Sequence, residues 1–298
     1  MYTESGCADR WKALMAPRTG DVRGELVAEA AEYFGLTADR VLDRMKNAAE
    51  RFKDEWQQHV SDPTDERALI QFYNETEAEI FELIDWHASD AIHYRTLMCL
   101  DVAQRRPGRR FLDYGSGIGS DAIVFAAAGY EVTLADVSEP LLNFARWRCE
   151  RRGFTVRAVD LKREALPLKT YDAAVCFDVL EHIPRPLRTL DRIGRTLEPG
   201  GLLFLHAPFG VDPDRPMHVV HADRITPRMR SVGFNWRGDL EADFPSWLWA
   251  PRVYERMAVS RLDQLGYFVY DVMMPGPIGA RLASVYRQLV PRVRAGAR

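Results

Sequence analysis

The sequence lacks several features that would restrict its function at once. Among its 298 residues no two cysteines form a C-x-x-C motif, which excludes the common zinc and disulfide frameworks. No stretch approaches the run of about 20 apolar residues that a membrane-spanning helix requires, and the polar N-terminus has no signal-peptide layout. A formal net charge of -3 provides no general attraction to nucleic acid. We therefore expect a cytoplasmic protein with neither a membrane nor a nucleic-acid partner.

The most informative segment that is present runs from Arg110 to Ser138, RFLDYGSGIGSDAIVFAAAGYEVTLADVS. It predicts a short apolar strand, a glycine turn, a helix, a second strand and a terminal acid, Asp136. Glycines let the backbone approach a ligand closely, and their G-x-G-x-G spacing differs from the G-x-G-x-x-G of dinucleotide sites. A carboxylate at the end of a strand can accept hydrogen bonds from a ribose diol; alternatively, it only caps a helix.

Later segments continue the same alternation of strands and helices. The segment 158–161 ends a third strand at an acid, 171–182 predicts a buried strand that runs into a helix start, and 197–206 predicts a turn followed by another buried strand. Such alternation is typical of a doubly wound parallel sheet, which binds its ligand at the carboxyl ends of the strands.

In this order the motifs resemble those of class I S-adenosylmethionine-dependent methyltransferases. The sequence FDVLEH at 177–182 is similar to small-molecule methyltransferases, such as those of ubiquinone biosynthesis, and differs from the D-P-P-Y motif of DNA amino methyltransferases. The resemblance implies S-adenosylmethionine as cofactor and an α/β, Rossmann-like, mostly parallel seven-stranded sheet with an N-terminal all-helical cap. It also implies a set of cofactor-binding residues: Asp113, Gly115, Gly117 and Gly119 for the methionine end, Asp136 and Val137 for the ribose, Asp160 and Leu161 for the adenine, and Asp178 beside the sulfonium.

The organisation of the chain follows from where strands begin. We expect a helical, substrate-binding cap over 1–105, a cofactor domain over 106–275 with an aromatic insertion at about 238–255, and a basic tail over 276–298. Within the cap, hydrophobic spacing predicts one helix from Thr37 to about residue 61 and another over 65–87. Towards the C-terminus we expect helices at 226–232 and 252–265 and strands at 234–237 and 267–273.

Residues for acceptor binding and proton transfer are harder to predict. Histidine has an unperturbed pKa near neutrality, so we expect His182 first, and His221 second, as a general base. Histidines at 218 and 221 lack the carboxylate arrangement of an H-E-x-x-H helix, so no metal is expected. Several residues of the cap and the late segments are candidates for an acceptor pocket, although each can instead be core packing: Tyr73, Trp86, His87, His206, His218 and Trp247.

Together these observations predict a methyltransferase that acts on an oxygen, nitrogen or carbon atom of a small organic acceptor, in biosynthetic or secondary metabolism. Whether two chains form a homodimer is left open. An alternative is an enzyme that cyclises S-adenosylmethionine itself and releases methylthioadenosine, as azetidine-carboxylate synthases do. A remote alternative is a DNA-binding regulator, because 25–42 vaguely resembles a helix-turn-helix, but its acidic residues oppose phosphate contact.

Overall fold

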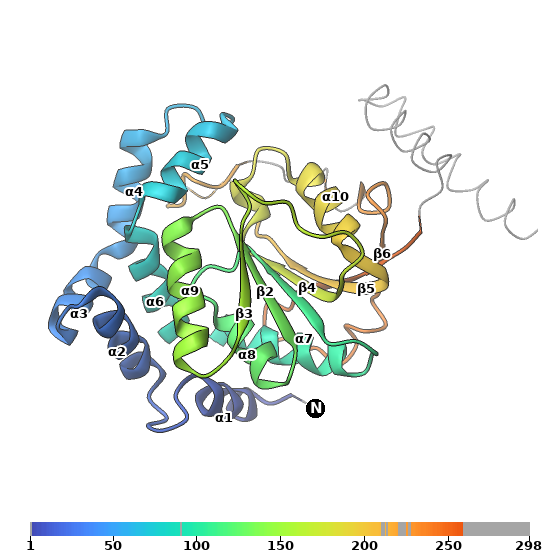
Figure 1. The fold of residues 1–298 in the computed structure, drawn as a ribbon, viewed down its shortest axis with the longest axis horizontal. Helices are drawn as coiled ribbons and strands as arrows, with labels where there is room; N and C mark the ends of the chain where they lie inside the picture. Colours follow the sequence, from blue (N-terminus) through green and yellow to red (C-terminus); the bar gives the residue numbers. More distant parts are fainter. Residues whose placement is uncertain are drawn as a thin grey trace, which may run out of the picture.

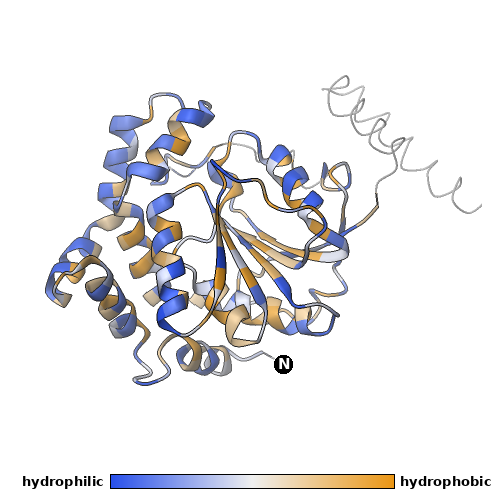
Figure 2. Cartoon of the chain, in the orientation of Figure 1, coloured by the Kyte–Doolittle hydropathy of each residue, from blue (hydrophilic) through white to orange (hydrophobic). Residues whose placement is uncertain are grey.

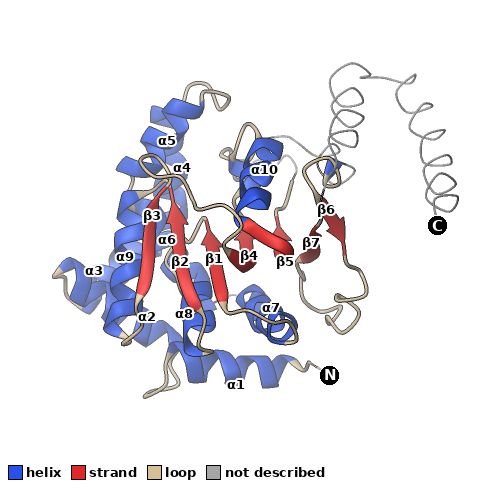
Figure 3. Cartoon of the chain, turned by 45° about the vertical axis from the view of Figure 1, so that its right-hand side comes forward, coloured by secondary structure: helices blue, strands red, loops and turns tan. Residues whose placement is uncertain are grey.

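The computed structural model describes residues 2–89, 91–209, 212, 214–219, 225 and 228–258. A seven-stranded sheet lies at its centre, in the order β3-β2-β1-β4-β5-β7-β6 (Figures 1 and 3). Strands β1 to β5 are parallel, whereas β7 runs antiparallel to both β5 and β6. The strands are β1 (Arg110–Tyr114), β2 (Glu131–Asp136), β3 (Val156–Asp160), β4 (Tyr171–Phe177), β5 (Leu197–His206), β6 (Phe234–Trp236) and β7 (Arg252–Arg256).

Helices precede the sheet and then alternate with its strands, so the expected N-terminal helical region and Rossmann-like sheet are both present. The helices before β1 are α1 (Glu4–Met15), α2 (Val22–Phe34), α3 (Ala38–Lys46), α4 (Ala48–His59), α5 (Glu66–Glu75), α6 (Ala78–Ser89), the 3-10 turn η1 (Ala91–Tyr94) and α7 (Arg95–Gln104). Those after β1 are α8 (Ser120–Ala127), α9 (Glu139–Arg151), the 3-10 turn η2 (Leu180–His182) and α10 (Pro186–Thr196).

The alternation of side chains along the strands creates two hydrophobic cores, one on each face of the sheet. Phe111 packs with residues of α7 and α8, whereas its neighbour Leu112 packs with Leu190 and Ile193 of α10. Because parallel strands are covered on both faces, the central strands are largely hydrophobic (Figure 2). This burial fixes which strand ends lie together at the edge of the sheet.

The N-terminal helices form a third core against α9 and the glycine turn. Its members include Ile84 of α6 and Ile118 and Phe144 of the sheet domain, so the cap is joined to the cofactor region by packing. Both long helices expected in the cap are divided. The first is interrupted at Asn47, between α3 and α4, and the second at Thr76, whose backbone is extended.

The C-terminal part of the described chain differs from the sequence-based expectation. Residues Arg252–Arg256, expected to begin a helix, form strand β7, because Val253 and Tyr254 are buried and pair with β5. Residues 228–233 form turns instead of the α-helix expected at 226–232, and β6 begins at Phe234 as expected. The strand expected at 267–273 and the tail at 276–298 lie outside the described residues. Among the residues that are described, no helix has the length and apolar character needed to span a bilayer.

Candidate active site

A large cavity, of about 760 Å³, opens at the carboxyl ends of β1, β2, β4 and β5. Its volume lies within the range of about 300–1,000 Å³ that is common for small-molecule sites. Helices α5 and α6 of the cap form one wall, the strand ends form the floor, and described residues of the segment 208–218 contribute to the rim. The cavity therefore lies between the cap and the sheet, where a cofactor and a second molecule can meet.

The glycine turn after β1 forms part of the floor. Gly115, Gly117 and Gly119 all have a positive φ, which L side chains rarely adopt. A Cβ at Gly115 would lie 2.2 Å from the Val179 side chain, and one at Gly119 would lie 2.9 Å from Ala145. Gly115 and Gly117 line the cavity, whereas Gly119 precedes α8 and is used for close packing.

Asp136 lines the cavity at the end of β2. Its carboxylate accepts hydrogen bonds from the backbone N–H groups of Gly117, at 3.2 Å, and Ser138, at 2.9 Å. Burial raises the pKa of Asp136, although these N–H groups partly oppose the effect. A carboxylate offers about four acceptor positions, so Asp136 retains capacity to accept from a ligand.

Two other predicted acids have internal partners and do not line the cavity. Asp113 is 2% exposed and accepts from the N–H of Ala122 at 3.1 Å. Burial, followed by the charge of Asp121, raises the pKa of Asp113 well above its ordinary value. Asp160 forms ion pairs with Lys162, at 3.0 Å, and with Arg163, at 3.4 Å, beside the cavity.

An aspartate, a histidine and an arginine form a group at the ends of β4 and β5. His206 Nδ1 lies 2.7 Å from Asp178 Oδ1, while Arg95 donates to the other oxygen of Asp178. The Arg95 guanidinium also lies over the ring of Phe177, at 4.3 Å from its centroid. Burial opposes the ionisation of Asp178, but Arg95 and His206 outweigh it, so the pKa of this carboxyl is below its ordinary value.

Asp178 itself has a φ of 54°, the left-handed region that is uncommon for a residue with a side chain. This backbone follows directly on buried β4 and is fixed by a hydrogen bond from its N–H to the carbonyl of His206, at 2.9 Å. A strained conformation held in place at a cavity is typical of functional sites.

A second histidine group lies closer to the cap. The hydroxyl of Tyr73, on α5, is 2.9 Å from His182 Nδ1, and the His182 and His218 rings are perpendicular with centroids 5.0 Å apart. Burial is the main cause that lowers the pKa of His182, to about 3. Glu181 precedes His182 and is buried, at 1% exposed. This group lines the upper part of the cavity.

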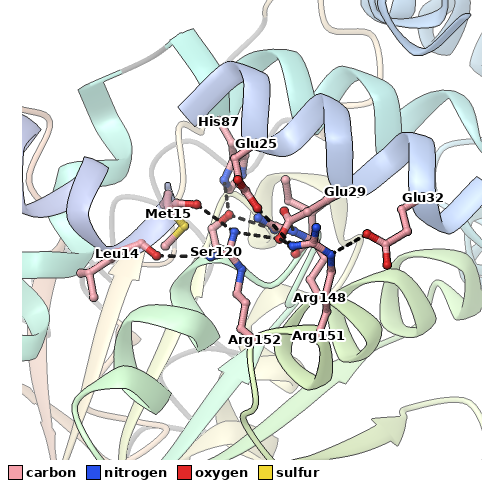
Figure 4. Close-up of polar contacts among 11 residues, drawn as sticks. Leu14, Met15, Glu25, Glu29, Glu32, His87, Ser120, Arg148, Arg151 and Arg152 are labelled. Atoms are coloured by element: carbon pink, nitrogen blue, oxygen red, sulfur yellow. Dashed lines mark hydrogen bonds and ion pairs between the residues drawn. The ribbon is translucent and has the colours of Figure 1, made fainter. Parts of the chain in front are cut away.

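His87 connects the cavity to a buried ionic network between cap and sheet (Figure 4). Its Nδ1 lies 3.0 Å from Ser120 Oγ, which also accepts from Arg148 at 3.3 Å. Arg148 donates to the carbonyl of Ile118 and to Glu29 of α2, at 2.8 Å for the latter. Burial lowers the pKa of His87 well below its ordinary value, so its imidazole is neutral at physiological pH.

The structure thus brings most, though not all, of the predicted site residues to one cavity. The following line it: Tyr73, Trp86, His87, Gly115, Gly117, Asp136, Val137, Leu161, Asp178, His182, His206 and His218. The following do not: Asp113, Gly119, Asp160 and Trp247, the last of which is 40% exposed. His221 lies outside the described residues.

Among the cavity residues that were not identified from the sequence, Arg95 and Glu181 bear on the chemistry of the site. Arg95 is 3% exposed. The sequence feature that could have indicated its burial is its place directly before the apolar residues of helix α7. Of the two tryptophans in the aromatic insertion, Trp249 borders the cavity although it is 71% exposed, whereas Trp247 does not line it. Glu181 is buried beside His182. The sequence pair Glu-His does not by itself indicate that the carboxylate is buried.

Comparisons with known proteins agree with this geometry. Residues 87–265 match the family model described as a methyltransferase domain. Ubiquinone biosynthesis O-methyltransferase of Xanthomonas campestris pv. campestris is 30% identical over 226 residues, which are 71% of this chain and 90% of that protein. The enzyme of the same name from Methylococcus capsulatus is 34% identical over 100 residues, which are 33% of this chain and 42% of that protein. The chain therefore matches less than half of this second relative.

A solved structure shows a similar fold. Burkholderia thailandensis 1,6-didemethyltoxoflavin-N1-methyltransferase, with bound 1,6-didemethyltoxoflavin and S-adenosylhomocysteine, aligns with a TM-score of 0.51. The alignment covers 67% of this chain and 92% of that one, at 19% sequence identity.

Proposed function

This chain belongs to the methyltransferase-domain family and its cofactor is S-adenosylmethionine, and from that premise we propose that it methylates a small organic acceptor held between cap and sheet. The observation that carries the proposal is the cavity, which joins the glycine turn and Asp136 to a separate group of aromatic and histidine residues under α5 and α6. A site for the cofactor alone would not need this second part.

The residues of the floor fit the cofactor. Gly117 presents no side chain, Asp136 has acceptor capacity for two ribose hydroxyls, and Leu161 offers an apolar surface beside them. When bound, S-adenosylmethionine supplies a methyl group on a positively charged sulfur. We propose that Asp113 and Gly119 act indirectly, by holding the start of α8 and the turn in place.

The upper part of the cavity would hold the acceptor. Its walls combine apolar side chains of the cap with a few polar groups, the composition expected of a small-molecule site. Leu69, Ile70 and Met217 would contact an apolar body, while Tyr73 and His218 would orient polar atoms. With both molecules bound, the cap would shield them from water, and their alignment would provide most of the rate enhancement.

We propose that His206 is the general base where the acceptor must lose a proton. His206 Nδ1 lies 2.7 Å from the Asp178 carboxylate and 3.1 Å from the Arg95 guanidinium. A proton on Nδ1, donated to Asp178, would leave the lone pair on Nε2. Asp178 then orients the ring, and Arg95 orients Asp178. This geometry favours His206 over His182, whose Nδ1 contacts the Tyr73 hydroxyl and has no carboxylate partner of this kind.

Calorimetry and product analysis test the proposed function. We expect the protein to bind S-adenosylmethionine and, with a metabolite extract, to form S-adenosylhomocysteine together with one methylated product that mass spectrometry identifies. Incubation with the cofactor alone separates the alternative reaction. Release of methylthioadenosine in that incubation would show that the cofactor is cyclised and would overturn the proposal.

A further inference from the structure

A metal-ligand set lies in the wall of the cavity, beyond the residues that fit the cofactor. One carboxylate oxygen of Glu181 and one ring nitrogen each of His182 and His218 lie within 4.8 Å of one another. Glu181 and His182 belong to η2, directly after β4, whereas His218 comes from the rim segment. Two imidazoles and a carboxylate are the ligand set of many zinc sites that keep a position open for water or substrate.

The Glu181 carboxylate gives independent support for a cation at this place. Its side chain is buried, and within the described part of the chain neither of its oxygens has a hydrogen-bond partner. Leaving a buried carboxyl group without a partner costs folding free energy, which a bound cation would recover. The guanidinium groups of Arg95 and Arg215 act on Glu181 through their charge, but neither forms an ion pair with it among the described residues.

The two histidines are held in orientations that suit ligation. The Tyr73 hydroxyl contacts His182 Nδ1 at 2.9 Å, and a metal bound through Nε2 would leave this contact in place. A metal-binding histidine usually donates its second ring N–H to an oxygen atom, and the Tyr73 hydroxyl can accept that bond. The rim segment is anchored by a hydrogen bond of 2.6 Å from the N–H of Val219 to the carbonyl of Glu181, which keeps His218 beside the other two side chains.

We propose that Glu181, His182 and His218 bind a divalent transition metal, with zinc favoured by the ligand types, and leave a coordination position open to the cavity. An oxygen or nitrogen atom of the acceptor would occupy that position. The role in acceptor binding rests on the proposed function, whereas metal binding itself does not. The H-x-x-H spacing at 218–221 is not the basis of the site, because two of the three ligands come from residues 181 and 182.

Metal titration of the full-length protein tests the proposal. After dialysis against EDTA, we expect the protein to take up a single equivalent of Zn²⁺ by calorimetry, and Co²⁺ to give the absorption bands of a low-coordinate site. Loss of a hydrogen-bond partner of a ligand weakens binding about 10- to 100-fold, which is the change we expect for Tyr73→Phe. Loss of a ligand, in Glu181→Gln or His218→Ala, should weaken it further.

The controls separate this proposal from misfolding and from the proposed function. His59→Ala removes an exposed histidine whose ring hydrogen-bonds to the Glu55 carbonyl of its own helix, and it should leave Zn²⁺ affinity unchanged. Each variant should keep its affinity for S-adenosylmethionine, which shows that the fold is intact. If wild type takes up no Zn²⁺ or Co²⁺, or if Glu181→Gln and His218→Ala bind both ions as tightly as wild type, the metal site is wrong. Failure to bind S-adenosylmethionine would instead contradict the proposed function.

Discussion

At the scale of single residues, the acids around the cavity differ in what surrounds them. Asp136 faces the cavity with backbone donors on one side, Asp113 is enclosed, and Asp160 is paired with cations. Asp178 is held between a guanidinium and an imidazole. These surroundings give each carboxylate a different expected effect on substitution.

Asp136→Asn should weaken binding of S-adenosylmethionine about 10- to 100-fold. The expectation follows from the loss of a charged acceptor for ribose hydroxyls, worth about 1.5–3 kcal/mol, with 1.4 kcal/mol per tenfold change. Calorimetry on wild type and variant measures it. Asp160→Asn is the matched control, because Lys162 and Arg163 already engage that carboxylate outside the cavity, and it should change the affinity less. An equal or larger effect of Asp160→Asn would contradict this ranking.

Asp113→Asn should change how stability depends on pH. Because the pKa of Asp113 is raised in the folded protein, the folded state binds its proton more tightly than the unfolded state does. Wild-type stability then falls as pH rises from the unfolded value of about 3.9 through the raised folded value. The variant lacks this loss, so its stability relative to wild type should increase between pH 4 and neutrality. Urea unfolding at several pH values measures the difference, and a difference independent of pH would refute it.

His206→Gln should lower kcat about 10²- to 10⁴-fold, the usual contribution of a general base, without weakening cofactor binding. Asp178→Asn should lower kcat as well, because it no longer fixes the proton on Nδ1 of His206. Steady-state kinetics with the acceptor identified from the extract measures both. A fall confined to His182 variants, with His206→Gln fully active, would show that the base has been misassigned.

At the scale of elements, a buried ionic network connects α2 of the cap to α9 and the glycine turn (Figure 4). Glu29 and Arg148 are both fully buried, and Arg152 also contacts Glu29, at 2.7 Å. Through Arg148 the network reaches Ser120 and the Ile118 carbonyl, which belong to the turn region. The position of the cap is therefore coupled to the floor of the cavity.

Glu29→Gln should destabilise the protein by about 3 kcal/mol or more, because it leaves two arginines buried without their counter-charge. Glu32→Gln is the control on the same helix. Its partner Arg151 is also at 2.8 Å, but the Glu32 side chain is 56% exposed, so the cost should stay below about 1 kcal/mol. Urea denaturation compares the two. Similar losses for both variants would show that burial of the network is unimportant.

At the scale of the whole molecule, the cavity draws its walls from two regions that are distant in sequence. Residues of α5 and α6 face the strand ends of the sheet across the cavity. A ligand that contacts both the cap helices and the strand ends should therefore reduce the motion of both regions.

Saturating S-adenosylmethionine should slow amide hydrogen exchange in α6 and in the glycine turn, because both line the cavity. At 100 times its dissociation constant the ligand should stabilise the protein by about 2.7 kcal/mol. Helix α1 packs on α7 and α8 and does not line the cavity, so it serves as an internal reference. Protection of the sheet without protection of α6 would mean that the cap takes no part in binding.

Much of the sheet domain follows from local sequence. Buried strands, the positive-φ glycine turn and the acids that end β2 and β3 are set by hydrophobic periodicity and backbone sterics, which act over a few residues. The break at Thr76 and the strand β7 were not predictable in this way. A hydrogen bond from Thr76 to Glu55 and pairing of β7 with β5 decide them, and both are tertiary contacts.

The sequence by itself determined the fold class, and also the glycine turn and Asp136 of the cavity floor, because neighbouring residues suffice to form a strand, a turn and its terminal acid. Only the tertiary structure decided which side chains act together above that floor. Arg95 and His206 are 111 residues apart in the chain, and Tyr73 and His182 are 109 apart, yet each pair is in contact. No local pattern encodes such a pair, since its members meet only when the cap packs on the sheet.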